Sequence, residues 1–323
     1  MKTTVIIPNY NGKKYLQDCL SFLKRSTGTA FHTIVVDDAS TDESCRMVRE
    51  HFPKVELVEL SENGGFARAV NEGIKRAKTE FVLLLNNDTI PEPEFVAQLE
   101  REIQKSKRTF SVSAKMLSMK EPEVIDDCGD LYCLLGWAFG IGKGQSSSRY
   151  TRPRRVFAAC GGAAIYRRAV LQKLGLFDEL HFAYLEDIDI GYRAQLYGYR
   201  NHYCPKAIVY HAGSASSGSR YNAFKVDLSS RNNVYLILKN MPPLQLLLNL
   251  PFLLAGFFIK TLFFIKKGFG AIYLKGLWKG LRLGLSKEGR KKHVRFSPRR
   301  LPYYLYVQYR LIMNTLALCD KIG

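Results

Sequence analysis

The chain has 323 residues, with 48 Lys or Arg against 29 Asp or Glu, so its formal net charge at pH 7 is +19. Its 46% of hydrophobic residues is enough to bury a large core, which excludes a disordered chain. The excess charge predicts an acidic partner: nucleic acid, an anionic membrane or a phosphate-bearing substrate. Residues 239–300 hold fourteen Lys or Arg and one acid, Glu288, so most of the excess lies in one C-terminal region.

The cysteines are widely spaced and contain no CxxC pair. This pattern predicts reduced structural thiols in a cytosolic protein rather than a disulfide framework or a zinc site. The seven positions are Cys19, Cys45, Cys128, Cys133, Cys160, Cys204 and Cys319.

The first ninety residues alternate short apolar runs with helical patterns. Helical spacing of apolar residues appears over residues 15–23, and a second helix is expected over residues 67–77. Strands alternating with helices of this length predict a parallel sheet with right-handed crossovers, and therefore an α/β domain. The apolar runs that predict buried strands are residues 3–7, 33–36, 55–60 and 81–85.

Polar side chains directly follow three of these strands, at residues 8–11, 37–38 and 86–88, and a helix is expected to start at residues 91–94. Ligands of open α/β sheets bind beyond the carboxyl ends of the strands, so we expect a nucleotide at this edge. The chain has no GxxxxGK[ST] motif and no GxGxxG after its first strand. A divalent metal held by Asp88 would therefore neutralise a diphosphate. A turn or helix-capping carboxylate is the alternative for Asp88.

The middle of the chain is less regular. Residues 120–155 are rich in loops and glycine and predict a flap or hairpin over the site. Residues 156–166 predict a strand interrupted by Gly161 and Gly162. Residues 207–211 predict a further short strand that ends at His211.

Three acids, Glu186, Asp187 and Asp189, stand at the start of a predicted helix. The helix dipole favours carboxylates there, which is one explanation for the pattern. Helical spacing also places Arg193 one turn after Asp189, so we expect these two to pair while the other two acids point elsewhere.

Four blocks in this order and spacing resemble the family 2 inverting glycosyltransferases of GT-A fold, and within them the bacterial rhamnosyltransferase-like branch. The blocks are VIIPNYN at 5–11, IVVDDASTD at 34–42, NGGFA at 63–67 with NEG at 71–73, and LLNNDT at 84–89. The resemblance implies the nucleotide-diphospho-sugar transferase fold, a mixed and mostly parallel sheet flanked by helices. The predicted domains are a catalytic domain over 1–220, with a nucleotide-sugar half (1–115) and an acceptor half (116–220), and a helical, membrane-associating region over 221–323.

The resemblance also assigns the nucleotide-sugar donor a binding site. Asp38 would accept a hydrogen bond from the N3–H of uracil or thymine, and Asp88 would be a metal ligand. Asn86 stands where the first acid of the family's DxD motif often sits, and an amide brings no charge to the metal. The implied donor-binding residues are Pro8, Tyr10, Asp38, Asn63, Gly64, Arg68, Asn86 and Asn87.

The acids at the predicted helix start resemble the family's ED motif. Asp187 would then be the catalytic base that takes the proton of the acceptor hydroxyl, and Glu186 would position it or contact the acceptor. His211 would be a second ligand of Mg²⁺ or Mn²⁺, although a lone histidine is more often structural. The loop over residues 212–219 would order over the donor diphosphate.

The C-terminal region predicts helices over residues 224–238 and 303–318, with an apolar segment over 244–265 between them. This segment is long enough to cross a bilayer, but Pro251 and Lys260 interrupt it, so an interfacial or re-entrant helix is favoured over a full span. The basic residues that follow suit the anionic cytoplasmic leaflet. A helical appendage with a solvated basic face is the alternative.

The sequence therefore predicts a metal-dependent inverting glycosyltransferase at the cytoplasmic face of the cell membrane, working in cell-surface polysaccharide synthesis. Its expected donor is dTDP-rhamnose or a UDP-sugar, and its expected acceptor is a saccharide linked to polyprenyl diphosphate. No nucleic acid partner is expected, because the basic residues surround an apolar segment that has no use on RNA or DNA. A non-catalytic nucleotide-sugar sensor on the membrane is the other alternative, against which the Glu186 and Asp187 pair argues.

Overall fold

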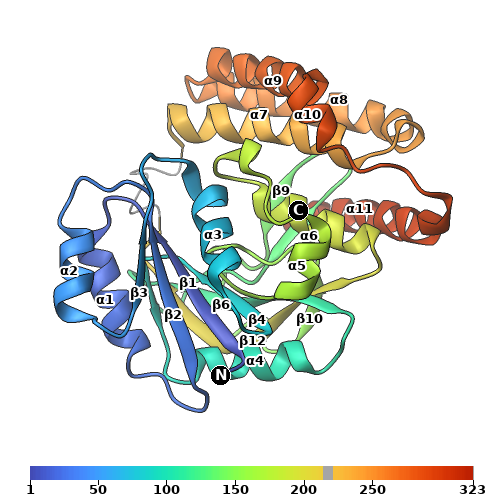
Figure 1. The fold of residues 1–323 in the computed structure, drawn as a ribbon. Helices are drawn as coiled ribbons and strands as arrows, with labels where there is room; N and C mark the ends of the chain where they lie inside the picture. The colour runs from blue at the N-terminus through green and yellow to red at the C-terminus, as the bar shows by residue number, and fades with distance from the viewer. Residues whose placement is uncertain (214–220, 323) are drawn as a thin grey trace.

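The structure is a computed structural model that describes residues 1–213 and 221–322. Its centre is a mixed sheet in the strand order β10-β12-β6-β11-β4-β1-β2-β3 (Figure 1). These strands are β1 (Thr3–Asn9), β2 (Phe31–Asp37), β3 (Glu56–Glu59), β4 (Phe81–Leu85), β6 (Thr109–Ser118), β10 (Arg154–Val156), β11 (Ala163–Arg167) and β12 (Arg200–His211). At its margins β5 (Thr89–Pro91) pairs with β12 and β7 (Ile125–Asp127) with β6, while β8 (Asp130–Tyr132) and β9 (Ala138–Gly140) form a separate ribbon.

Strands β1 to β4 are parallel, as the alternating pattern predicts. Pro8 lies opposite Val36 and Asn9 opposite Asp37, so the polar ends of β1 and β2 meet at one edge. Strand β11 is inserted antiparallel between β4 and β6, and β12 runs parallel to β6. The expected mixed and mostly parallel sheet is therefore confirmed, together with the polar edge at the carboxyl ends of its strands.

Two helical layers cover the sheet. On one face α1 (Lys13–Leu23), α2 (Ser44–His51) and α4 (Phe95–Gln104) bury their apolar sides against β1 and β4. On the other face α3 (Gly65–Arg76), α5 (Arg168–Leu174) and α6 (Glu186–Leu196) do the same. Two cores of side chains, one on each face, fix the strand ends that carry the site.

The C-terminal region is helical, and α7, α8 and α9 lie together at the end of the molecule opposite the N-terminus (Figure 1). Helix α9 packs closely on α7, because glycines face it: a Cβ on Gly280 would lie 2.3 Å from the carbonyl oxygen of Arg231. The elements are α7 (Ala223–Asn240), α8 (Pro243–Lys266), α9 (Gly270–Leu285), α10 (Lys287–Lys291) and α11 (Leu301–Ile322). The helices predicted over 224–238, 244–265 and 303–318 are confirmed.

Two local predictions were wrong. Residues 156–166 are not one strand, because β10 and β11 lie at separate places in the sheet and a loop joins them. The chain also does not enter a helix at residues 91–94: Thr89–Pro91 forms β5 against the end of β12, and α4 starts only at Phe95. Both errors come from tertiary pairing, which overrides the local pattern.

Candidate active site

Asp88 and His211 lie together at the carboxyl edge of the sheet. Asp88 lies in the turn between β4 and β5, and the pairing of Thr89 with His211 brings the end of β12 to the same place. The Asp88 Oδ1 and His211 Nε2 atoms are 3.4 Å apart. On its other side His211 Nδ1 lies 2.7 Å from Asp126 Oδ2, and Lys143 Nζ lies 2.5 Å from Asp126 Oδ1.

These contacts set the charges of the group. Burial alone would lower the pKa of His211, but hydrogen bonds to Asp126 and Asp88 outweigh it and raise that pKa to about 9. Burial would raise the pKa of Asp126, but His211 and Lys143 hold it well below its usual range. A cationic imidazolium thus stands between two carboxylates.

This donor set fits a divalent cation. With Nδ1–H donating to Asp126, loss of the Nε2 proton would leave that atom of His211 free to bind a metal, which is the usual carboxylate–histidine–metal arrangement. Asp88 adds a carboxylate oxygen, the ligand that Mg²⁺ and Mn²⁺ prefer. Asp126 was not predicted from the sequence, because it lies in a three-residue strand of a loop-rich stretch without a motif of its own.

Asp38 follows β2, and its side chain lies against the N-terminal end of α3. Its two oxygens accept hydrogen bonds from the backbone N–H of Gly64 at 2.9 Å and of Gly65 at 2.8 Å. Burial raises the pKa of Asp38, although these amides and Arg68 oppose the rise. Arg68 reaches from α3 to Glu62, 2.7 Å away. The structure therefore brings together three of the predicted donor-binding residues, Asp38, Gly64 and Arg68. Each oxygen of Asp38 keeps a further lone pair that can accept another hydrogen bond.

The remaining predicted donor-binding residues surround this edge. Pro8 is half-buried at the end of β1, and Tyr10 is 49% exposed beyond it. The Asn87 amide donates to Asn9 Oδ1 at 2.7 Å, and Asn63 Oδ1 accepts from the N–H of Gly65 at 3.2 Å. The loop expected to order over the diphosphate falls largely on residues 214–220, which lie outside the described residues.

Asp187 is joined to the same edge through the glycine pair. The N–H of Gly161 lies 3.2 Å from Asp187 Oδ2, and the carbonyl of Gly162 accepts from the N–H of Asn86 at 2.8 Å. The loop before β11 thus links the end of β4 to the start of α6. Burial raises the pKa of Asp187 and, together with the charge of Asp187, raises that of Glu186 well above its usual value. Among the described residues Glu186 Oε2 has no hydrogen-bond partner.

The backbone before α6 is strained. Phe182, Tyr184 and Leu185 have φ angles of 63°, 70° and 67°, where residues other than glycine are uncommon. Helix α7 holds this loop: Asn232 Nδ2 lies 2.8 Å from each of the carbonyl oxygens of His181, Ala183 and Tyr184. Arg231 Nη2 adds contacts of 3.0 and 2.8 Å to the carbonyls of Leu180 and His181. Nothing in the sequence predicted these contacts between α7 and the loop before α6.

The predicted pair of Asp189 and Arg193 is confirmed, with Arg193 Nη2 2.6 Å from Asp189 Oδ2. It belongs to a larger buried group. Lys239 Nζ of α7 lies 2.8 Å from Asp189 Oδ2 and 2.6 Å from Asp178 Oδ2, and Asn240 donates to Asp189 Oδ1 at 2.8 Å. The side chain of Asp189 therefore points away from the site, as expected from helical spacing.

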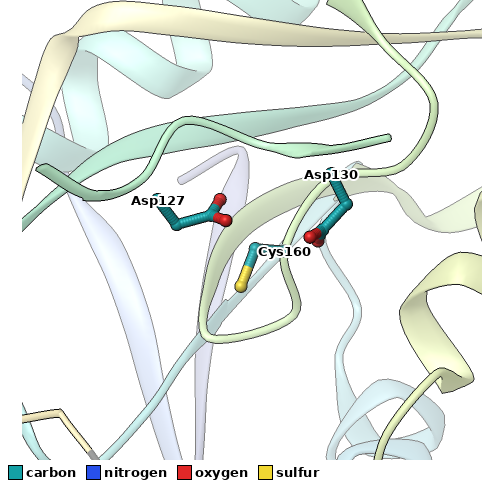
Figure 2. Close-up of side chains that lie close together, drawn as sticks. All are labelled: Asp127, Asp130 and Cys160. Atoms are coloured by element: carbon teal, nitrogen blue, oxygen red, sulfur yellow. The ribbon is translucent and has the colours of Figure 1, made fainter. Parts of the chain in front are cut away.

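A further group of side chains lies beside Asp187. Asp127, Asp130 and Cys160 lie close together, and one carboxylate oxygen of each acid and the Cys160 sulfur are within 4.8 Å of one another (Figure 2). Burial, with the charges of Asp126 and Asp187, raises the pKa of Asp127 to about 7, and burial raises the pKa of Asp130 well above its usual range. Burial thus favours the protonated form of both acids, which can donate as well as accept hydrogen bonds. The six cysteines with described side chains are unpaired, as predicted.

Residues 4–175 match the family model described as Glycosyl transferase family 2, which is more than half of the chain. The chain therefore belongs to this family, and the resemblance seen in the sequence is confirmed. Known structures share its GT-A fold. Staphylococcus aureus TarS 1-349 in complex with UDP-GlcNAc superposes with a TM-score of 0.61 at 22% identity, covering 97% of this chain and 89% of that chain. A mannosyltransferase from Pyrobaculum calidifontis in complex with GDP-Man and Mn²⁺ gives a TM-score of 0.54 at 20% identity over 90% and 82%.

Relatives by sequence are glycosyltransferases. Glycosyltransferase GlyG of Streptococcus pneumoniae is 32% identical over 31% of this chain and 35% of that protein. The N-acetylglucosaminyl-diphospho-decaprenol L-rhamnosyltransferase of Mycobacterium tuberculosis is 24% identical over 66% of this chain and 77% of that protein. The matches to GlyG and to full-length TarS span only 35% and 16% of those proteins. By sequence the chain is a member of glycosyl transferase family 2, and its fold is that of GT-A enzymes.

Proposed function

We propose that this chain is a metal-dependent inverting glycosyltransferase that moves a sugar from a nucleoside-diphosphate donor to a lipid-linked saccharide in cell-surface polysaccharide synthesis. The observation that carries the proposal is the placement of Asp187. It is linked through Gly161 and Gly162 to the edge of the sheet where Asp88 and His211 meet. A carboxylate base at Asp187 and a cation-binding edge at Asp88 and His211 would then face one site from two sides.

In this reaction Asp187 takes the proton of the acceptor hydroxyl as its oxygen bonds to the anomeric carbon. The bond from that carbon to the diphosphate breaks on the opposite face, so the configuration inverts, and the nucleoside diphosphate leaves with the bonding electrons. A carboxyl whose pKa is raised by burial accepts this proton more readily at neutral pH. The backbone N–H of Gly161 orients one of its oxygens.

Asp88 and His211 would hold a divalent cation, which supplies positive charge for the diphosphate of the leaving group. The sequence has no GxxxxGK[ST] motif, and no GxGxxG after its first strand, to do this. Asp126 would keep His211 in the tautomer that presents Nε2 to the cation. The Pyrobaculum mannosyltransferase, whose structure is a complex with GDP-Man and Mn²⁺, supports a divalent metal.

The donor is proposed to be dTDP-rhamnose or a UDP-sugar. Pro8, Tyr10 and Asp38 would line the base and ribose, with Arg68 close to them. The exposed ring of Tyr10 is available for a base to stack on it. Asn63 and Gly64 would line the base beside Asp38, and Asn86 and Asn87 would bind the ribose or sugar hydroxyls. The rhamnosyltransferase among the relatives supports dTDP-rhamnose, and the TarS complex supports a UDP-sugar.

The acceptor is proposed to be a saccharide on polyprenyl diphosphate. The mycobacterial relative, by its name, acts on an N-acetylglucosaminyl-diphospho-decaprenol, which supports this class of acceptor. Glu186, Asp127 and Asp130 lie on the Asp187 side of the site and would accept hydrogen bonds from sugar hydroxyls.

A membrane surface is supported by helices α8 and α11, which expose apolar side chains and are joined on their inner sides by polar ones. Gln245 and Asn249 of α8 face inward, and each donates to Gln308 of α11 at 2.9 Å. Outward, Leu254 and Phe258 are 58% and 64% exposed. Helix α8 is long and apolar enough to cross a membrane, but its inner side packs on the protein from Gln245 to Phe264. We therefore propose that it lies along the cytoplasmic face of the bilayer.

The Asp187→Asn variant tests the catalytic proposal. The amide keeps the size of the side chain but cannot take the proton, so kcat should fall by about 10²- to 10⁴-fold. The Kd of the donor should stay within about twofold, because the donor edge is unchanged. Donors come from a panel of UDP-, dTDP- and GDP-sugars with Mn²⁺, Mg²⁺ or EDTA, and turnover is followed with a polyprenyl-diphosphate N-acetylglucosamine acceptor.

The matched control is Asp18→Asn, which makes the same change on the exposed side of α1. It should leave both kcat and donor binding unchanged. Full turnover by Asp187→Asn would refute the assignment of the base. Donor binding without turnover by the wild-type protein on any acceptor would favour the membrane-bound nucleotide-sugar sensor instead.

A further inference from the structure

A cavity of about 400 Å³ lies at the C-terminal ends of α5 and α6, separate from the candidate active site. Arg193 and Tyr197 of α6 line it, whereas Asp187 is at the other end of the same helix. Ten residues of helix separate Asp187 from Tyr197, which is about 15 Å. The opposite side, here called the wall, is formed by residues 291–295, at the end of α10 and just beyond it, and by Arg300 before α11.

The charges on the floor of this cavity are balanced. Asp178, Arg193 and Lys239 line it, and Asp189 lies directly behind them. Lys239 pairs with both acids at 2.6 and 2.8 Å, and Arg193 pairs with Asp189 at 2.6 Å. Two acids thus neutralise two bases, so the floor adds no net charge.

The wall, by contrast, carries positive charge that nothing balances. Within the described ranges, Lys291, Lys292, Arg295 and Arg300 form no ion pair. The fifth titratable group of the wall is His293, and burial lowers its pKa, which favours the neutral ring. Its Nε2 lies 3.0 Å from the carbonyl of Gly284.

Two contacts hold this wall in place. The guanidinium of Arg300 lies 4.2 Å from the centre of the Tyr197 ring, and its buried Nη1 has no hydrogen-bond partner among the described residues. The backbone N–H of Val294 donates to the carbonyl of Lys239 at 2.8 Å. The cationic segment is thus fixed on α6 and α7 rather than free in solvent.

We propose that this cavity is a binding site for a phosphate group, either of an anionic lipid head or of a soluble phosphate. Four uncompensated cations around one cavity favour a multiply charged oxyanion, and the volume lies within the range of about 300–1,000 Å³ usual for small-molecule sites. Phe296, beside the cavity wall, is 52% exposed. An apolar side chain next to a basic cavity fits a phosphate that belongs to a membrane surface.

The test compares two triple variants of equal charge. Lys291→Gln/Lys292→Gln/Arg295→Gln removes three exposed cations of the wall, and Lys266→Gln/Lys267→Gln/Lys275→Gln removes three exposed cations elsewhere in the helical region. All six positions are exposed, so both variants should keep the unfolding temperature of the wild type. The probes are inorganic pyrophosphate, titrated calorimetrically in EDTA, and vesicles of phosphatidylcholine with or without phosphatidylglycerol.

The cavity variant should bind pyrophosphate at least about tenfold more weakly than the wild type, while the control variant should bind it unchanged. If the cavity variant also loses more phosphatidylglycerol-dependent binding than the control, and pyrophosphate competes with these vesicles, the source is the lipid head. If the vesicles bind both variants alike, the source is soluble phosphate.

Equal pyrophosphate affinity in all three proteins would overturn the proposal, because the anion would then bind elsewhere, for example at the donor edge. An equal loss in both variants would overturn it too, since general charge rather than the cavity would be responsible. Neither result depends on sugar transfer.

Discussion

The side chain of Asn232 in α7 lies 2.8 Å from the carbonyl oxygen of Tyr184, two residues before Glu186. Tyr184 has a φ of 70°, and Leu185, directly before the acid pair, has a φ of 67°. Such angles cost about 1–3 kcal/mol per residue unless the surroundings hold them. A helix of the C-terminal region thus fixes the backbone from which Asp187 projects.

Replacing Asn232 with alanine should therefore lower kcat more than it changes donor binding. Without the amide, three backbone carbonyls lose a donor and the strained loop can relax, which would displace Asp187. A displacement of about 1 Å can cost about a hundredfold in rate. We expect kcat to fall by about 10- to 100-fold with the donor KM nearly unchanged, measured by steady-state kinetics.

The matched control is Asn314→Ala. Asn314 is as deeply buried and also donates to a backbone carbonyl, that of Tyr132, at 2.8 Å, but it does not touch the loop before α6. Both variants should lose a similar amount of stability, and only Asn232→Ala should lose kcat. An equal kcat in the two would show that Asn232 contributes to stability alone.

The strand pattern predicted the sheet edge because β1, β2 and β4 are buried on both faces and end abruptly in polar residues. Parallel pairing then places Asp38 and Asp88 at one edge without further information. The pairing of Asp189 with Arg193 was equally predictable, because the two residues are one helical turn apart in α6. Roles for these residues came only from the resemblance to the family.

The contacts between distant segments could not be predicted. Asp126 joins His211 from a position 85 residues earlier, and Asn232 holds a loop about 50 residues before it. Neither residue belongs to a periodic pattern. The antiparallel insertion of β11 between β4 and β6 is likewise set by packing, and it is what brings Gly161 to Asp187.

His181 makes the stability depend on pH. It is fully buried, its Nε2 has no hydrogen-bond partner among the described residues, and burial lowers its pKa to about 4. An unfolded histidine has a pKa of about 6.5. The folded pKa is depressed, so the unfolded state binds more protons between these values, and stability falls as the pH drops from about 6.5 to about 4.

This effect is on the order of 3 kcal/mol across that window. The His181→Phe variant keeps a ring against Tyr235, whose ring centre is 5.2 Å away, and should lose most of the pH dependence. Urea unfolding at several pH values measures it. The slope of the wild type in His181→Phe would contradict the assignment.

Asp126 should control metal affinity without being a ligand. It holds Nδ1 of His211 at 2.7 Å, and such partners typically contribute about 10- to 100-fold to metal binding. We expect Asp126→Asn to weaken Mn²⁺ binding by that factor, measured by electron paramagnetic resonance titration with UDP present. Asp88→Asn should weaken it more, because a proposed ligand is lost. Unchanged Mn²⁺ affinity in both variants would remove the metal from this edge.

Helix α8 should attach the protein to membranes through its outer face. Leu254→Glu/Phe258→Glu replaces two exposed apolar side chains by charges that an anionic bilayer repels. Losing the burial of two such side chains and adding this repulsion should weaken binding to phosphatidylglycerol vesicles by at least about a hundredfold. The inner contacts of Gln245 and Asn249 with Gln308 are untouched, so the fold should be retained.

Gln17→Glu/Gln104→Glu adds the same charge at exposed positions of the catalytic domain and should bind vesicles almost as well as the wild type. Cosedimentation with vesicles measures both variants, and sedimentation velocity measures their mass in solution. A different result is that the wild-type protein does not bind vesicles but self-associates, with the α8 variant monomeric. That result would show that a second copy of the chain covers this face. Equal vesicle binding by the α8 variant and the control would place the membrane contact on the basic residues alone.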